Sequence, residues 1–98
     1  MEVEFGDEDL NRLETDLSLT GGWGQAIVRA FRKRMQFIRA APDERAFYAM
    51  RSLRFERLQG DRSHQHSMRL NDQWRLILEI KQSSPKNIIV VMAIEDYH

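Results

Sequence analysis

Arginines, a tyrosine and a histidine are the side chains of this sequence whose types and spacing best suit chemistry. Arg69 and Arg75 stand close together in the sequence, and Asp96, Tyr97 and His98 follow one another. Guanidinium groups match phosphate oxygens geometrically, and an imidazole can give or take a proton near neutral pH. This set suits transesterification of RNA, in which a base removes the 2′-OH proton, an acid protonates the 5′-oxygen and cations stabilise the phosphate.

A β-hairpin centred on residues 71–73 must position the two arginines. Apolar and polar residues alternate in both arms, which gives each arm one apolar face. A two-residue loop would set Arg69 opposite Trp74 and mix the faces, whereas a three-residue loop sets Leu70 opposite Trp74 and Arg69 opposite Arg75. We therefore predict the three-residue loop, with both guanidinium groups on the face away from the apolar residues.

The formal net charge of zero hides an asymmetry along the chain. Residues 1–20 hold seven acids and one arginine, a net charge of −6, whereas residues 29–75 hold twelve arginines and lysines and five acids, a net charge of +7. Such a split suggests a body that binds a polyanion, with an acidic segment elsewhere on the surface. Ordinary solvated helix faces would give the same counts, so charge alone leaves both interpretations open.

Length and composition predict one domain, residues 1–98, with a single core. The sequence contains no cysteine, which excludes disulfides and thiolate metal sites. It has no signal-peptide pattern, and no apolar run approaches the ~20 residues that span a membrane. We expect a cytoplasmic protein that does not interact with membranes.

The hydrophobic pattern predicts an α+β fold, in which N-terminal helices pack on one face of a small, mainly antiparallel twisted sheet. The expected order is β-α-α-(α)-β-β-β-β, with a strand at 2–5, helices at 7–17 and 25–40, a short third helix around 47–53, and strands at 54–58, in the two hairpin arms and at 88–94. The last strand is apolar throughout, which is typical of a strand buried on both faces. We expect the other face of the sheet to be open, so that the arginines and residues 96–98 can converge there.

Histidines and acids offer two further kinds of site. His64 and His66 would point to one face of a strand and, with His98, suggest a metal site, but no third, acidic ligand is evident. We therefore predict no metal and no other cofactor. Glu56 and Asp61 could serve in acid–base catalysis or form salt bridges with neighbouring arginines. No Ser-His-Asp spacing or glycine-rich phosphate loop is present, which argues against ATP and dinucleotide chemistry.

Three segments form a specific combination of motifs in the C-terminal half: residues 58–62 (LQGDR), 64–76 (HQHSMRLNDQWRL) and 95–98 (EDYH). In these segments the chain resembles the HigB-like killer toxins of the RelE/ParE superfamily. The resemblance implies the toxin of a type II toxin–antitoxin system, a small mRNA endoribonuclease that enters the ribosomal A site and inhibits translation. It also implies a helix-turn-helix antitoxin of the HigA kind, through which alone the toxin would contact operator DNA.

The resemblance assigns residues as well as a function. The positions that match the family pattern are Asp96, Tyr97, His98, Arg75 and Arg69, and Glu56 is a candidate base. Contacts with RNA are expected from the basic residues Arg54, Arg57, Arg62, His64 and His66. The chain departs from the pattern at Gln59, because many members carry a basic residue there.

Two alternatives remain open within the same superfamily. A ParE-type toxin would inhibit gyrase by binding and would have no nuclease activity, since one scaffold serves different targets. An attenuated toxin would act mainly as co-repressor of its operon together with the antitoxin. Gln59 motivates this second alternative, because fewer cationic groups weaken the anchoring of phosphate.

Overall fold

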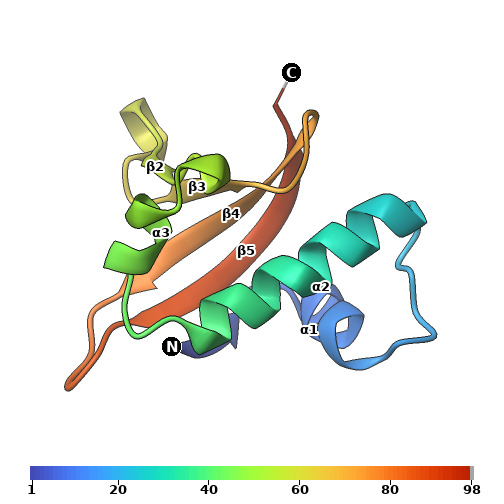
Figure 1. The fold of residues 1–98 in the computed structure, drawn as a ribbon, viewed down its shortest axis with the longest axis horizontal. Helices are drawn as coiled ribbons and strands as arrows, with labels where there is room; N and C mark the ends of the chain where they lie inside the picture. Colours follow the sequence, from blue (N-terminus) through green and yellow to red (C-terminus); the bar gives the residue numbers. More distant parts are fainter. Residues whose placement is uncertain (98) are drawn as a thin grey trace.

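The computed structural model describes residues 1–97, and within them the elements follow the predicted order (Figure 1). They are β1 (Glu2–Phe5), α1 (Glu8–Thr15), α2 (Gln25–Ala40), α3 (Arg45–Ala49), the 3₁₀ turn η1 (Arg51–Leu53), β2 (Glu56–Arg57), the 3₁₀ turn η2 (Gly60–Arg62), β3 (His66–Arg69), β4 (Trp74–Lys81) and β5 (Ile88–Asp96). None of the helices among these residues is long and apolar enough to cross a membrane.

The first helix is shorter than its leucine pattern predicts. The Asp7 side chain caps it by accepting a hydrogen bond from the backbone N–H of Asp9, and Leu10 and Leu13 are buried. The helix ends at Thr15, because the Asp16 carboxylate accepts hydrogen bonds from Ser18 and so competes with a further helical turn. Leu17, which we predicted on the apolar stripe, is consequently 78% exposed.

The second helix spans the predicted residues and supplies most of the helical part of the core. Its stripe of Ile27, Phe31, Met35 and Ile38 is buried, as predicted, and Val28 joins it. These residues pack against one face of the sheet, where Met68, Leu70, Leu76, Leu78, Ile89, Val91 and Ile94 complete the same cluster. The helices therefore cover one face of the sheet, as the α+β prediction requires (Figure 1).

The described residues form a five-stranded mixed sheet in the order β1-β5-β4-β3-β2. β1 runs parallel to β5 at one edge, and the other neighbouring pairs are antiparallel. The predicted strand 54–58 is reduced to Glu56–Arg57, because Arg54 has the left-handed conformation (φ 46°, ψ 48°) that ends η1. β2 is thus a short edge strand whose two residues are exposed.

The hairpin has the predicted register, with Arg69 opposite Arg75 and Met68 opposite Leu76. The Leu70 N–H donates to the Trp74 carbonyl, so residues 71–73 form the three-residue loop. Asn71 fixes this loop, since its side-chain oxygen accepts hydrogen bonds from the backbone N–H groups of residues 73 and 74.

The last strand departs from the prediction in one respect. Its pairing with β4 shifts by one residue between Ile77 and Leu78, which leaves Met92 as the extra residue of a β-bulge. Ile89, Val91 and Ile94 face the helices, while Val90 and Met92 on the other side are only partly buried. The strand is therefore not buried on both faces, although it is central and apolar.

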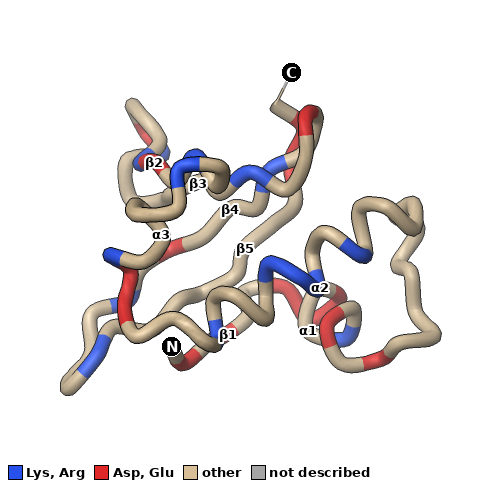
Figure 2. The backbone as a smooth tube through the Cα atoms, in the orientation of Figure 1, with Lys and Arg blue, Asp and Glu red and all other residues tan. Residues whose placement is uncertain are grey.

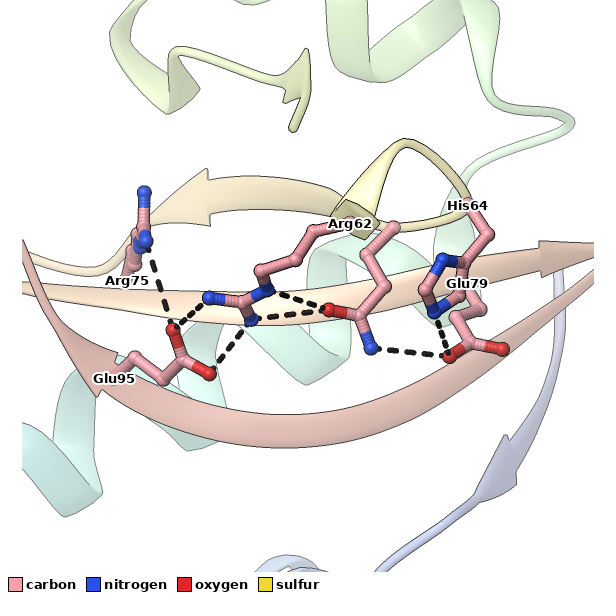
Figure 3. A network of polar contacts seen from close by, with 6 residues as sticks. Arg62, His64, Arg75, Glu79 and Glu95 are labelled. Carbon is pink, nitrogen blue, oxygen red and sulfur yellow. Dashed lines mark hydrogen bonds and ion pairs between the residues drawn. The ribbon is translucent and has the colours of Figure 1, made fainter. Parts of the chain in front are cut away.

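The second face of the sheet is not fully open, in contrast to our prediction. Ser67 and Ile77 point to this face and are almost completely buried. The chain between β2 and β3, residues 58–65, turns back over this face and is held there by side-chain hydrogen bonds to β4 and β5 (Figure 3). The end of the face near the 71–73 loop remains accessible for a site.

Candidate functional site

The candidate site is a row of charged side chains across three neighbouring strands. Arg69 on β3 pairs with Arg75 on β4, and Arg75 pairs with Glu95 on β5. Directly opposed residues of adjacent strands point to the same face, so the three side chains lie side by side on the face away from the helices. We call this row, together with Tyr97 and Arg54, the arginine face.

Tyr97 extends the arginine face beyond the end of β5. Its N–H donates to the Gln73 carbonyl (2.8 Å), which continues the strand pairing by one residue. The guanidinium carbon of Arg75 lies 5.5 Å from the centre of the Tyr97 ring, within cation–π range. Burial raises the pKa of the Tyr97 hydroxyl above its usual 10.0, although Arg75 opposes the shift. The phenol is therefore protonated at neutral pH and can donate a hydrogen bond or a proton.

Arg54 reaches the same end of the face from the strained turn before β2. Together with Arg69, Asp72 and Tyr97 it lines an open pocket of about 390 Å³. A non-glycine residue in the left-handed region costs of the order of 1 kcal/mol and is common at functional sites. Glu56, two residues further on, lies close enough to Tyr97 to act on its pKa. The structure thus brings Arg54, Glu56, Arg69 and Tyr97 to one place.

Arg75 is more enclosed than Arg69. Its side chain is 20% exposed, and its Nη2 lies 3.6 Å from a carboxylate oxygen of Glu95. Its Nε is buried and has no hydrogen-bond partner among residues 1–97. Buried donors are normally paired, so this nitrogen is an exception that His66 Nδ1 and Ser67 Oγ share among the described residues.

The sequence analysis overlooked Arg34, which supports the arginine face from α2. Its Nε donates to the Arg69 carbonyl (2.9 Å) and its Nη2 to the Leu70 carbonyl (3.3 Å). Burial, and the nearby charge of Arg69, lower the pKa of this guanidinium. The sequence does indicate that Arg34 faces the core. Arg34 lies three residues after Phe31 and four before Ile38, on the same stripe of the helix.

Glu95, which was not among the predicted site residues, binds Arg62. Figure 3 shows Arg62 reaching from the loop to Glu95, with two hydrogen bonds of 2.9 and 2.7 Å. Arg62 also contacts Gln65, which in turn donates to Glu79. The hydrogen bonds from Arg62 hold the pKa of Glu95 below its usual range. Arg62 therefore fastens the loop over the sheet, and its contact with RNA stays a prediction.

His64 and His66 line one pocket, although their neighbours lie on different sides of the sheet. His64 is exposed and lies 3.8 Å from Glu79 on the loop-covered face. His66 pairs with Leu78, points to the helix side and stacks on Phe55. Among residues 1–97 no group of three or more histidines or acids is arranged to hold a metal ion.

The remaining predicted site residues do not all join the arginine face. Asp96 pairs with Trp74 and so lies on the opposite side of β5 from Arg75, where Gln73 donates to its carboxylate (3.0 Å). Arg57 pairs with His66 and points to the helix side. The prediction for His98 lies outside the described residues.

An ion pair and hydrogen bonds from two arginines of α2 join this helix to α1 and the loop that follows it. Figure 2 shows acidic residues along β1 and α1 and basic residues along α2. Arg39 of α2 binds Glu14 of α1 through two hydrogen bonds of 2.7 Å, and Arg32 donates to carbonyls at the end of α1 and in the following loop. Glu14 of the acidic segment therefore neutralises Arg39 of α2, while Arg32 binds backbone carbonyls.

The predicted α+β fold is confirmed. Two solved structures share it. The YoeB/ParE toxin from Agrobacterium tumefaciens is 14% identical, with a TM-score of 0.62 and coverage of 100% of both chains. YafQ from E. coli strain BL21(DE3) is 10% identical, with a TM-score of 0.59, covering 98% of this chain and 92% of that one. No protein-family model and no curated protein matches the sequence. At these identities the likeness shows the fold alone and does not distinguish a HigB-like branch.

Proposed function

We propose that this protein is the toxin of a type II toxin–antitoxin system, and that it cleaves mRNA on the ribosome without a metal ion. The observation that carries the proposal is the convergence of Arg69, Arg75 and Tyr97 on one face, beside the unpaired Nε of Arg75. The fold shared with a YoeB/ParE toxin supports the class of protein. The motif resemblance in residues 58–62, 64–76 and 95–98 supports the reaction and the HigB-like branch.

The arginine face supplies the electrostatic part of this reaction. Attack by the 2′-oxygen gives the phosphorus a fifth oxygen ligand and concentrates negative charge on the phosphate. Arg69 and Arg75 would bind the non-bridging oxygens, and Arg54 would hold the neighbouring phosphate from the other side of the pocket. One preorganised donor of this kind contributes about 10²- to 10³-fold to the rate.

Two proton transfers complete the reaction. A base takes the proton from the ribose 2′-OH, the O2′–P bond forms, the P–O5′ bond breaks and an acid protonates the departing O5′. The products are a 2′,3′-cyclic phosphate and a 5′-OH. Tyr97, protonated at neutral pH, suits the donor role, while His98, the next residue in the sequence, and Glu56 are the candidates for the base.

The partners follow from the same proposal. The toxin would act in the ribosomal A site, and a helix-turn-helix antitoxin of the HigA kind would neutralise it. The protein would require no cofactor, and operator DNA would be reached only through the antitoxin.

The test is expression of the protein without its antitoxin, followed by mapping of cellular transcripts. We expect mRNA cleavage that stops when translation is blocked, with 2′,3′-cyclic phosphate ends. An unaltered transcript pool during growth arrest would refute the nuclease.

A ParE-type gyrase inhibitor is the second candidate, because the name of one structural neighbour includes ParE. Double-strand DNA breaks without mRNA cleavage would select it. Harmless overexpression would instead favour an attenuated toxin that acts as co-repressor, the alternative that Gln59 motivates.

A further inference from the structure

A second polar pocket lies at the β2 edge of the sheet, where His64 and His66 both line it. Its volume is about 510 Å³, and its lining includes Glu44, Tyr48, Arg57, His66 and Asn87. None of these residues lines the pocket of Arg54, Arg69 and Tyr97. We call this second cavity the Tyr48 pocket.

Aromatic rings form one wall of the Tyr48 pocket. The Phe55 ring stacks on His66 (4.9 Å between ring centres, 10° between planes) and meets the Tyr48 ring edge to face (4.9 Å, 77°). Phe55 and His66 are buried, but Tyr48 is 54% exposed. An aromatic ring held in place and half-exposed is a stacking surface that tolerates any planar partner.

The imidazole of His66 forms a buried part of the pocket lining. The residue is 7% exposed, it lines the pocket, and its Nδ1 is buried without a hydrogen-bond partner among residues 1–97. Burial, helped by the charge of Arg57, lowers the pKa of this imidazole. The ring is therefore neutral at neutral pH, with one donor and one acceptor nitrogen.

The polar groups of the pocket include both donors and acceptors. Asn87 donates from its side-chain nitrogen to a Glu44 carboxylate oxygen (2.8 Å), which holds the amide and the carboxylate together. Arg57 adds a guanidinium donor. A phosphate offers only acceptors and would be repelled by Glu44, whereas the edge of a nucleobase offers donors and acceptors together.

The Tyr48 pocket is also close to the arginine face along the chain. Arg54 lines the arginine-face pocket and Arg57 lines the Tyr48 pocket, and three residues span at most about 10 Å. Both residues of β2 are exposed at the edge of the sheet. A single strand of RNA can therefore pass over this edge from one pocket to the other.

We propose that the Tyr48 pocket binds a nucleobase of single-stranded RNA close to the cleaved linkage. Tyr48 stacks on the base, while Glu44 and Arg57 read its hydrogen-bonding edge. That the ligand is RNA rests on the proposed nuclease function. The residues of the Tyr48 pocket would set which base the protein prefers.

The experiment measures binding of short RNAs whose 2′-hydroxyls are methylated, so that no cleavage can occur. Fluorescence anisotropy gives the affinity of the full chain for oligonucleotides that differ at one base. We expect one base to bind at least about tenfold more tightly than another. Tyr48→Ala should weaken binding of every sequence by about tenfold, and Tyr48→Phe should retain it.

The variant Glu44→Gln distinguishes recognition of the nucleobase from electrostatic attraction of the RNA phosphates. Loss of the carboxylate should change which base is preferred, while Glu2→Gln, a change of the same kind on an exposed residue of β1, should leave the ranking intact. Equal affinity for all bases, wild-type binding by Tyr48→Ala, or an unchanged ranking in Glu44→Gln would each overturn the proposal.

The two hypotheses fail separately. Base-selective binding that depends on Tyr48, in a protein that cleaves no mRNA, would refute the nuclease and leave the pocket assignment standing. If the protein cleaves mRNA with a base preference that Tyr48→Ala and Glu44→Gln leave unchanged, the nuclease function stands and the pocket assignment is refuted. Occupation of the Tyr48 pocket by antitoxin, with no binding of RNA, would overturn the nucleobase assignment.

Discussion

Arg34, on α2, donates from its Nε to the backbone carbonyl of Arg69 across 2.9 Å. A second hydrogen bond, to the Leu70 carbonyl, ties the helix to the end of β3 immediately before the 71–73 loop. The contact fixes the backbone from which the Arg69 side chain extends. It also places a third guanidinium beside Arg69, and burial together with the charge of Arg69 lowers the pKa of Arg34. The helical layer therefore supports the arginine face directly.

Arg34→Met should destabilise the protein by about 1–3 kcal/mol, because it leaves two carbonyls without their donor. Urea unfolding measures the change, and Lys33→Met, an exposed neighbour on the same helix, is the control. A free energy of unfolding within ~0.5 kcal/mol of wild type, the range of ordinary surface substitutions, would contradict the supporting role.

Arg75→Ala should lower the rate of mRNA cleavage by about 10²- to 10³-fold, since a charged donor to the phosphate is lost. Arg75→Lys should recover only part of the rate, because an ammonium lacks the guanidinium fork. The measurement is cleavage in a reconstituted translation reaction. Arg45→Ala serves as control, because Arg45 is exposed and pairs only with Asp43 within the described chain. Equal rates in the two alanine variants would rule out a role for Arg75 in catalysis.

Tyr97→Phe should keep the ring beside Arg75 but slow cleavage by at least about 10²-fold, the usual value of a proton-transferring group. Because burial raises the pKa of Tyr97, the hydroxyl stays protonated through the neutral range and ionises only at strongly alkaline pH. The Tyr97-dependent part of the rate should therefore be flat near neutrality and fall only above about pH 10. A pH–rate profile of both proteins tests this expectation, which fails if the phenylalanine variant cleaves at the wild-type rate.

Deletion of His98 should relieve toxicity while binding of the antitoxin stays intact. The expectation follows from the imidazole's ability to transfer a proton near neutral pH. Growth after induction and co-purification with the antitoxin measure the two properties. Retained mRNA cleavage by the truncated protein would refute a catalytic role for His98.

Glu95→Gln should reduce the loss of stability in acid. The hydrogen bonds from Arg62 lower the pKa of Glu95 below its ordinary 4.5. The carboxylate therefore stabilises the fold above that pH, and this contribution disappears as the pH falls through the lower pKa of the folded state. Thermal unfolding between neutral pH and about pH 3 should show a shallower decline for Glu95→Gln than for Glu2→Gln. Parallel declines would mean that the pair with Arg62 contributes nothing.

Several features of the fold could be predicted from the sequence because they follow from local rules. The period of the apolar residues gave the bounds of α2, and the requirement for one apolar face per arm gave the register that sets Arg69 opposite Arg75. Other local details were mispredicted. The strand 54–58 was cut short by the left-handed conformation of Arg54, and the helix 7–17 by the hydrogen bonds of Asp16.

Alternation within the hairpin determined the pairing of Arg69 with Arg75, because side chains of a strand point to opposite faces in turn. The tertiary structure alone decided which other residues meet this pair. The bulge at Met92 and the pairing of β5 put Tyr97 on the side of Arg75 and Asp96 on the other. The return of residues 58–65 engaged Arg62 with Glu95, and helix packing brought Arg34 to Arg69. Such contacts join residues far apart in the sequence, and local periodicity carries no information about them.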